Sequence, residues 1–267
     1  MRDLFDEIWS DIRRNKLRTA LTGFAVAWGI FMLIFLLGAG NGLIHALESN
    51  NSDYLANTMN VWGGRTNKAY KGMQEGRRIK LNDKDVEITL GPDFSDKVEE
   101  AGTILFQSSV TASHGKEYIV RQLTGVSPEH FRVNKIDLMF GRPINDVDIK
   151  EKRRVIVMDS NDARELLGVD GERETGLTAM QKAEKAKALI GEYVKIGTSM
   201  FQVIGIIRPN NQGNVNIFTP ITTLRTIYNR GQDIDEYYFS FHGLKTMEAN
   251  EAFEDKLRTA LSKNHNT

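Results

Sequence analysis

The chain has 267 residues, with 35 lysines and arginines against 35 aspartates and glutamates, five histidines and no cysteine. A mean hydropathy of −0.37 indicates a folded, mostly water-soluble chain that is too charged for several membrane spans. Zero formal net charge argues against a nucleic-acid binder, whose affinity needs clustered cations. The absence of cysteine excludes disulfides, thiolate zinc sites, iron–sulfur clusters and cysteine nucleophiles.

Residues 1–18 predict a short amphipathic helix. Five apolar residues fall on one helical face, and four acidic residues fall on the other. The apolar face holds Leu4, Phe5, Ile8, Trp9 and Ile12, and the acidic face holds Asp3, Asp6, Glu7 and Asp11. We interpret this helix as lying in the cytoplasmic membrane interface, with Trp9 at the level of the headgroups. A helix packed on a partner protein is the equal alternative, and both arrangements can hold together.

Residues 19–47 contain no Asp, Glu, Lys or Arg. From Ala20 to Gly40 the only polar side chain is Thr22, and these 21 residues would form about 31 Å of helix, which matches a bilayer core of about 30 Å. The run therefore predicts one transmembrane helix. A cleaved signal peptide ending near residues 38–40 and a buried helix of a soluble domain are the alternatives. The run is longer than the apolar region of a signal peptide, which has about 7–15 residues.

Basic residues flank only the N-terminal end of this run. Arg13, Arg14, Lys16 and Arg18 precede the run, whereas Glu48 and Asp53 follow it. Positive residues stay on the cytoplasmic side of a membrane, so the N-terminus is predicted inside and residues 48–267 outside. Together with Trp9, the four basic residues form a predicted interfacial anchor in contact with membrane lipid.

Small residues recur four positions apart within the run. The pairs are Gly23 with Ala27, Ala25 with Gly29, and Gly38 with Gly42. This spacing lets membrane helices approach closely, so the first two pairs predict a helix-packing surface. The general abundance of glycine in membrane helices is the alternative explanation. Gly38, Gly40 and Gly42 are predicted to form the junction between the helix and the domain that follows.

Residues 48–267 alternate irregularly between predicted strands and helices. Strands are expected at 58–62, 78–81, 104–112, 118–126, 154–158, 193–196, 200–207, 215–219 and 236–242. Helices are expected from Asn82 or Asp83 to about Ile88, from Ser127, from Ser160 or Asn161 to Leu167, and over 178–189, 221–228 and 247–261. Two strand pairs, 104–112 with 118–126 and 193–196 with 200–207, are predicted hairpins. The pattern favours an α+β fold with mixed sheets, and no second run is long enough to span a membrane.

Residue details at three helices make these predictions specific. Ser127 is expected to cap a helix that has Pro128 in its first turn. Gly168 is expected to end the helix that precedes it. In the last helix, Met247, Phe253, Leu257 and Leu261 are expected to face inward.

No catalytic constellation is visible in the sequence. It has no nucleophile elbow, no paired-histidine zinc motif and no phosphate-binding loop. The histidines at positions 45, 114, 130, 242 and 265 lack metal-ligand spacing, and each is interpreted as a surface or half-buried polar residue. Asp146 and Asp148 begin like a calcium loop but lack its glycine and its closing glutamate, so a solvated loop is expected. We therefore predict no catalytic residue, no cofactor and no metal.

Two further patterns have ordinary interpretations. Residues 150–154 form a basic cluster, expected to be a solvated turn, with a contact to acidic lipopolysaccharide or to a partner as the alternative. Phe239 and Phe241 share one face of a strand, as core packing requires; a ligand platform is the alternative.

Five stretches in order resemble MacB-type ABC transporter permeases, the family of MacB and the lipoprotein-releasing permeases. The first runs from Asn15 through the span to Leu43. The others are 124–131, 155–158 leading to 165–168, 190–196 through 201–205, and 218–221. Each stretch is short, but the five occur in the order of the family and together extend over nearly the whole chain.

The resemblance implies a non-catalytic permease portion in the bacterial inner membrane. The outer domain would have two lobes, a porter-like lobe at 48–130 and 208–267 and an inserted, mostly β lobe at 131–207. The partners implied are a cytoplasmic ABC ATPase subunit, a second copy or a related permease, a periplasmic adaptor and an outer-membrane channel. ATP-driven motion would pass through the span to drive drug, peptide or lipoprotein extrusion.

Two features depart from the family pattern. Residues 169–189 resemble an added helix, and the chain stops at Thr267, before a second span, as expected of a truncated chain or of one piece of a split permease. The start at Met1, close to the span, favours a separate ATPase subunit. A signal-anchored ligand-binding or sensor domain is the alternative function, and a membrane-anchored enzyme is a third.

Overall fold

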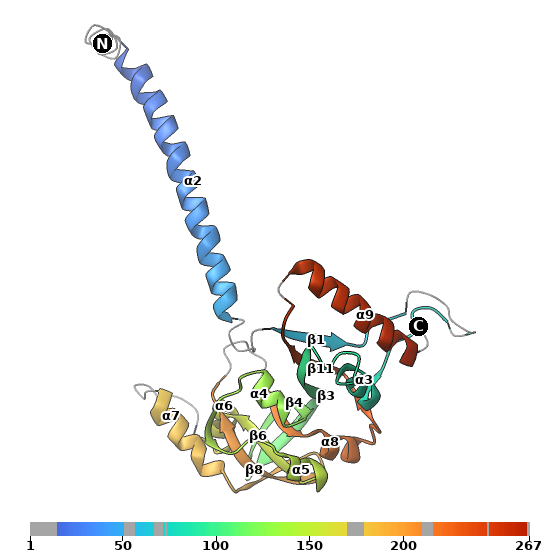
Figure 1. Cartoon of the computed structure of the whole chain (residues 1–267). Coiled ribbons are helices and arrows are strands. Elements are labelled where there is room, and N and C mark those ends of the chain that lie inside the picture. Colours follow the sequence, from blue (N-terminus) through green and yellow to red (C-terminus); the bar gives the residue numbers. More distant parts are fainter. Residues whose placement is uncertain are drawn as a thin grey trace. The chain divides into compact units, whose positions relative to one another are not determined.

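The structure is a computed structural model that describes residues 15–50, 57–66, 72, 74–169, 179–209, 216–244 and 246–265. The chain divides into two units, Met1–Ser52 and Asp53–Thr267 (Figure 1). The first unit contains one long helix, and the second is a mixed α/β domain.

The helix of the first unit, α2, extends over Lys16–Asn50. Its 35 residues correspond to a length of about 52 Å. The predicted helix over 19–47 is confirmed and is longer at both ends. The part from Lys16 to Leu43 is long enough to cross a membrane, and its most apolar window of 18 residues has a mean hydropathy of 2.3. All side chains from residue 20 to residue 43 are exposed within this unit.

The two threonines near the start of α2 satisfy their hydroxyl groups within the helix. Thr19 Oγ1 donates to the carbonyl oxygen of Asn15 at 3.2 Å, and Thr22 Oγ1 donates to that of Arg18 at 3.0 Å. These bonds lower the cost of placing a hydroxyl in an apolar environment. Thr22 is therefore compatible with a membrane-spanning helix.

The second unit is built around a sheet that contains nine strands in the described part of the chain. The order is β1 (Thr58–Trp62), β11 (Glu236–Phe241), β3 (Val98–His114), β4 (Glu117–Val126), β9 (Asn216–Pro220), β6 (Val155–Asp159), β8 (Ser199–Ile207) and β5 (Leu138–Gly141). The remaining strand, β7 (Tyr193–Ile196), pairs with both β3 and β8. The pairings of β3, β4, β9, β6, β8 and β7 thereby close a ring.

Parallel and antiparallel pairs are mixed in this sheet. The two predicted hairpins, β3 with β4 and β7 with β8, are confirmed as antiparallel pairs. The pairs β4 with β9 and β6 with β8 are parallel. A separate two-stranded sheet pairs β2 (Leu81–Asn82) with β10 (Asp233–Ile234). The predicted α+β class with mixed sheets is thus confirmed.

Helices connect and flank the strands (Figure 1). They are α3 (Asp83–Thr89), α4 (Glu129–Val133), α5 (Asp146–Lys150), α6 (Ser160–Leu166), α7 (Ala179–Ala186), the 3₁₀ turn Lys187–Leu189, α8 (Ile221–Tyr228) and α9 (Met247–His265). Strands from both predicted lobes belong to the nine-stranded sheet. The division into lobes stays a prediction.

The core lies between the sheet and these helices. Its largest fully buried side chains include Tyr237, Phe94, Phe201, Phe239 and Leu105. Phe239 and Phe241 are both buried in this core, which confirms their packing role. At Gly125 in β4, a Cβ atom would lie 3.1 Å from Ile221 Cα, so the absent side chain lets α8 approach the strand.

Three predicted details at helix starts and faces are wrong. Asp159, and neither Ser160 nor Asn161, caps α6, because its Oδ1 accepts from the backbone N–H of Asn161 at 2.6 Å. Ser127 does not cap α4; its Oγ accepts instead from the backbone N–H of Thr103 in β3 at 3.1 Å. Met247 is 75% exposed, whereas the other predicted inward residues of α9 contact the core.

Candidate functional site

The small residues predicted as a helix-packing surface lie on two faces of α2. At 100° per residue, Gly23 and Ala27 fall on one face, and Ala25 and Gly29 fall on the opposite face. A Cβ atom at Gly23 or Gly29 would meet nothing within 4 Å. These glycines are therefore not required for packing inside their own unit, and the packing role stays a prediction.

An aromatic ladder occupies one side of the same helix. Phe24 lies 5.9 Å from Trp28 between ring centroids, Trp28 lies 5.6 Å from Phe31, and Phe31 lies 6.3 Å from Phe35. The spacing of four, three and four residues aligns these rings along the helix. Ala25 and Gly29 lie on a neighbouring face of the helix, which Leu36 shares.

The predicted junction residues Gly38, Gly40 and Gly42 lie inside α2, which continues to Asn50. Glycine costs a helix about 1 kcal/mol relative to alanine at each position, so three of them in five residues weaken the helix here. A Cβ atom at any of the three would meet nothing within 4 Å. Within this unit a larger side chain would therefore be accommodated without a clash.

The predicted interfacial anchor is only partly described. Trp9, Arg13 and Arg14 lie outside the described residues. Lys16 and Arg18 lie in the first turn of α2, which has no acidic residue. Cations at this end oppose the helix dipole, so they do not serve helix stability. The attraction of positive charge to the cytoplasmic side of a membrane offers a reason for their position.

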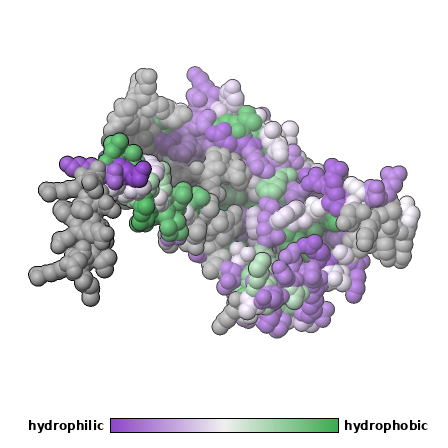
Figure 2. All heavy atoms as spheres, turned by 90° about the horizontal axis from the view of Figure 1, so that it is seen from above, coloured by the Kyte–Doolittle hydropathy of each residue, from purple (hydrophilic) through white to green (hydrophobic). Residues whose placement is uncertain are grey.

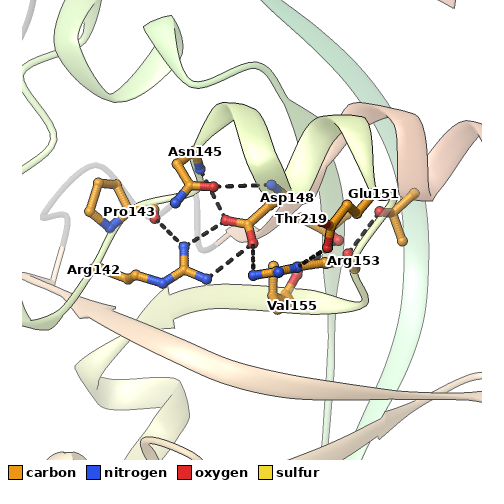
Figure 3. A network of polar contacts seen from close by, with 9 residues as sticks. Arg142, Pro143, Asn145, Asp148, Glu151, Arg153, Val155 and Thr219 are labelled. Carbon is orange, nitrogen blue, oxygen red and sulfur yellow. Dashed lines mark hydrogen bonds and ion pairs between the residues drawn. The ribbon is translucent and has the colours of Figure 1, made fainter.

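A polar network around Asp148 fixes one corner of the α/β domain (Figure 3). Asp148 is fully buried and accepts from both terminal nitrogens of Arg142, at 2.6 and 3.0 Å. It also accepts from the backbone N–H of Asn145 at 3.1 Å, and Arg153 lies 3.8 Å away. Asn145 caps α5 in return, because its Oδ1 accepts from the backbone N–H of Asp148 at 3.0 Å. The expectation of a solvated loop at Asp146 and Asp148 is therefore wrong.

This network keeps the buried carboxylate charged. Burial alone would raise the pKa of Asp148, but the hydrogen bonds from Arg142 and from the amide of Asn145 hold that pKa below its usual value. Backbone contacts extend the network into β9 and α8: Thr219, Thr222 and Thr223 donate hydroxyl hydrogen bonds to carbonyl oxygens of residues 155, 149 and 153. The network is structural and holds the turn after α5 in place.

A second buried carboxylate joins α6 to β4. Asp162 Oδ1 accepts from Arg121 Nε at 2.9 Å, and Glu165 accepts from Arg121 Nη2 at 2.8 Å. Asp162 Oδ2 is buried and has no hydrogen-bond partner among the described residues. Burial raises the pKa of Asp162 to about 6, against the opposing charge of Arg121.

The structure corrects the interpretation of one histidine. His130 is buried, with its ring centroid 5.4 Å from that of Phe218 and 6.1 Å from that of Tyr238. Its Nδ1 lies 2.8 Å from Asn134 Nδ2, which donates when Nδ1 is unprotonated. Burial lowers the pKa of His130 to about 3, so the ring is neutral at ordinary pH. His114, His242 and His265 contact Tyr193, Glu99 and Asp85 respectively.

The described residues contain no group of three His, Asp or Glu side chains that could hold a metal ion. The perturbed groups Asp148, Asp162 and His130 each have a structural environment of their own. An apolar helix long enough to cross a membrane precedes a mixed α/β domain. Together they define the class of helix-anchored α/β domains.

The comparisons with known proteins identify the family. Residues 19–260 match the family model of the MacB-like periplasmic core domain. The chain belongs to this family, which is that of MacB-type ABC transporter permeases. The family resemblance seen in the sequence is thus confirmed.

Two relatives illustrate how much of a whole transporter chain this sequence covers. The macrolide export ATP-binding/permease protein MacB 1/2 of Paracoccus denitrificans is 24% identical over 223 residues, which are 81% of this chain and 30% of that protein. The probable syringafactin export ATP-binding/permease protein SyfD of Pseudomonas syringae is 27% identical over 175 residues, 62% of this chain and 24% of that protein. This chain therefore spans less than a third of these relatives.

Two solved structures share the fold. The periplasmic region of MacB from Actinobacillus actinomycetemcomitans has a TM-score of 0.58 at 17% identity and covers 80% of this chain and 86% of its own. The extracellular domain of the ABC-type transporter YknZ from Gram-positive bacteria has a TM-score of 0.59 at 17% identity and covers 78% and 96%. At this identity the likeness concerns the fold alone.

Proposed function

We propose that this chain is the first membrane span and the outer domain of an ABC exporter permease. The observation that carries the proposal is the extent of the family match, which begins at residue 19 and so includes α2 together with the α/β domain. A cleaved signal peptide would leave the family module without its helix. The permanent membrane helix therefore belongs to the function.

The proposed orientation places the N-terminus in the cytoplasm and residues 48–267 in the periplasm of a bacterial inner-membrane protein. The first turn of α2 carries Lys16 and Arg18, whereas its last turn carries no basic residue, as the rule of cytoplasmic positive charge requires. Trp9, Arg13 and Arg14 complete the anchor in this proposal.

The chain itself performs no chemistry in this proposal. A separate cytoplasmic ATPase subunit hydrolyses ATP, and the motion passes through α2 to the outer domain. The permease works as a dimer with a second copy or a related chain, and an adaptor and an outer-membrane channel complete the export path. In this proposal the outer domain consists of a porter-like lobe (48–130 and 208–267) and an inserted lobe (131–207).

Cysteine labelling tests the orientation cleanly, because the chain contains no cysteine. We would introduce Ser10→Cys before the span or Glu87→Cys at an exposed position of α3 and treat spheroplasts with a membrane-impermeant maleimide. The expected result is labelling of Cys at position 87 in intact spheroplasts and of Cys at position 10 only after lysis. Labelling in the reverse order would overturn the proposed orientation.

A second experiment tests transmission through the glycine junction. Gly40→Leu and Gly42→Leu, placed in the complete transporter, should abolish complementation of a deletion strain although neither side chain clashes within its own unit. Ala39→Leu, on another face of the helix, is the matched control. Full complementation by both glycine variants, with normal membrane levels, would contradict the transmission role.

A further inference from the structure

Four neighbouring strands of the sheet, β4, β3, β7 and β8, bring residues from distant parts of the chain into one row. Ser113 of β3 is paired with Tyr118 of β4 on one side and with Lys195 of β7 on the other. Lys195 is paired in turn with Met200 of β8. Residues opposite each other on paired strands point to the same face of a sheet, so these four side chains share one face. At about 4.8 Å between strands, the row is about 14 Å long.

Exposed apolar side chains lie around Lys195 on this face. Val120 and Tyr193 share the face, because each lies two residues from a member of the row on the same strand. Tyr118 and Tyr193 are 67% and 54% exposed, and Val120 and Met200 are also exposed. At a full area of about 200 Å² each, the two tyrosines alone expose about 240 Å². With Val120 and Met200, this Lys195 face reaches the range of about 300–600 Å² in which an apolar patch is often functional.

The opposite side of the same strands fixes this orientation. Ile119, Val194 and Phe201, which alternate with the exposed residues, are at most 2% exposed and belong to the core. A shift of one residue in register would move these core residues to the surface. Strand β7 is also held on both sides, by β3 and by β8. The exposed side chains therefore stay on the outside, and nothing in the described part of the chain covers them.

Strand formation does not require these apolar side chains. Threonine favours strands as valine and tyrosine do, and Thr111, which is paired with Val120 on the same face, is such a residue. Methionine is not among the residues enriched in strands, yet Met200 occupies an exposed strand position. Tyrosine and methionine are, by contrast, enriched at protein interfaces. The composition of the Lys195 face thus fits an interface better than it fits the needs of the fold.

The charge of this face selects its partner. Within the paired segments 110–114, 117–121, 193–196 and 199–202, Lys195 is the only charged residue on the face. It is exposed and has no ion pair in the described part of the chain. One cation among apolar side chains is complementary to an apolar surface that carries one carboxylate.

Two other occupants fit this arrangement less well. A second copy that used the same face would bring two Lys195 cations together, because each copy presents the same surface to the other. A membrane with acidic lipids attracts proteins through clusters of about four to eight cations, and this face has one.

We propose that the Lys195 face is a docking surface for another folded protein, whose apolar surface carries a carboxylate opposite Lys195. The apolar contacts supply the contact area, and the single ion pair fixes the register of the two surfaces. The proposal goes beyond the proposed function, and it does not depend on export or on the orientation of the chain across the membrane.

Photo-cross-linking in cells that express the full chain tests the proposal. Benzoylphenylalanine is introduced at position 118 or 193 and, as the matched control, at position 84 on exposed Lys84 of α3. We expect positions 118 and 193 to capture the same protein, at least tenfold more efficiently than position 84. Mass spectrometry then locates the contact on that protein and its nearest carboxylate. Equal yields at the three positions, or no product at 118 and 193, would overturn the proposal.

A charge exchange tests the role of Lys195. Lys195→Glu should reduce capture at position 118 at least fivefold, and replacement of the partner's nearest carboxylate by lysine should restore capture when the two changes are combined. Unchanged capture in Lys195→Glu, or failure of the exchange to restore it, would overturn the proposed pairing.

Two further variants separate docking from folding. Tyr118→Thr and Met200→Thr should each reduce capture at position 193 at least fivefold. The thermal unfolding temperature should not change, because threonine keeps the strand preference and neither side chain is buried. A lower unfolding temperature in both variants would assign these side chains to the fold and overturn the docking role.

The mass of the cross-linked product separates the other occupants. A product of twice the chain mass would assign the face to a second copy. Addition of one phospholipid at position 118, for the full chain in phosphatidylglycerol nanodiscs, would assign the face to the membrane. Either result would overturn the proposal. If maleimide labelling instead contradicts the proposed orientation, the docking surface is unaffected.

Discussion

The apolar residues of helix α2 are exposed, whereas those in the core of the α/β domain are buried. In α2, Leu33 and Phe35 are 60% and 59% exposed, whereas Phe239 in the domain is fully buried. On the face displayed in Figure 2, hydrophobic residues gather on the helix and the surface of the domain is mainly hydrophilic. The domain satisfies its own hydrophobic residues, but α2 needs an apolar environment from outside its unit. The domain is therefore stabilised by its own core, whereas α2 is stabilised by its surroundings.

The largest expected effect comes from charging α2. Ile30→Arg together with Leu33→Arg should cost about 6 kcal/mol of membrane insertion, at about 3 kcal/mol for each change at the centre of a span. The double variant should appear in the carbonate-extractable fraction, whereas the parent chain remains with the membrane. Val120→Arg, an exposed change in β4, is the control and should leave the distribution unaltered. Retention of the double variant in carbonate-washed membranes would contradict the environment assigned to α2.

Truncation of a core side chain in the domain tests the same difference between the two units. The Phe239 ring contacts those of Tyr237, Phe241 and Phe253, so Phe239→Ala should lower the free energy of unfolding of the domain by about 4 kcal/mol. Phe31→Ala in α2 removes a similar ring that is 55% exposed and should leave domain unfolding unchanged. Urea denaturation followed by circular dichroism measures both. Equal losses would show that the two units unfold together.

The pH dependence of stability tests a feature found only in the domain. Burial raises the pKa of Asp162 to about 6, above the value near 3.9 of an unfolded chain, so the folded state binds the proton more tightly. The resulting stabilisation is complete below about pH 3.9 and is lost as the pH rises through 6, by at most about 3 kcal/mol. Asp162→Asn should remove this part of the profile, measured by denaturation between pH 4 and 7.

Two comparisons make the Asp162 measurement specific. Glu87→Gln, an exposed change in α3, should retain the parent profile. His130 acts in the opposite direction, since burial lowers its pKa to about 3 and its protonation opposes folding at acidic pH. A profile that stays unchanged in Asp162→Asn would remove Asp162 as its source.

Local patterns in the sequence predicted the helices and strands. The features that the sequence analysis missed depend on contacts between residues that are distant along the chain. The apolar run and the two hairpins depend on neighbouring residues, and both predictions are confirmed. His130 is buried by Phe218 and Tyr238, which lie far along the chain, so its position in a short helix gave no indication of burial. Long-range packing therefore determined the surroundings of this histidine.

Asp148 shows that a local signal was available and was interpreted wrongly. The spacing from Asn145 to Asp148 is that of a capping box, which predicts a helix start, and Arg142 precedes it as an available cation. Burial of the carboxylate, however, depends on the folding of loop 142–145 against β8, where a Cβ atom at Gly205 would lie 2.6 Å from the carbonyl oxygen of Arg142. The sequence indicates the cap, and only the tertiary fold supplies the burial.

The smallest expected effect concerns the end of α9 where the sequence prediction is wrong. Met247 has the helical spacing of an inward residue, but it lies in the first turn of α9 and is 75% exposed, so spacing alone did not determine burial. Met247→Ala should therefore change the free energy of unfolding by less than about 0.5 kcal/mol. Leu257→Ala, at a position of the same helix that is 4% exposed, should cost about 2–5 kcal/mol. A loss at Met247 comparable to that at Leu257 would mean that another surface covers this end of α9 in solution.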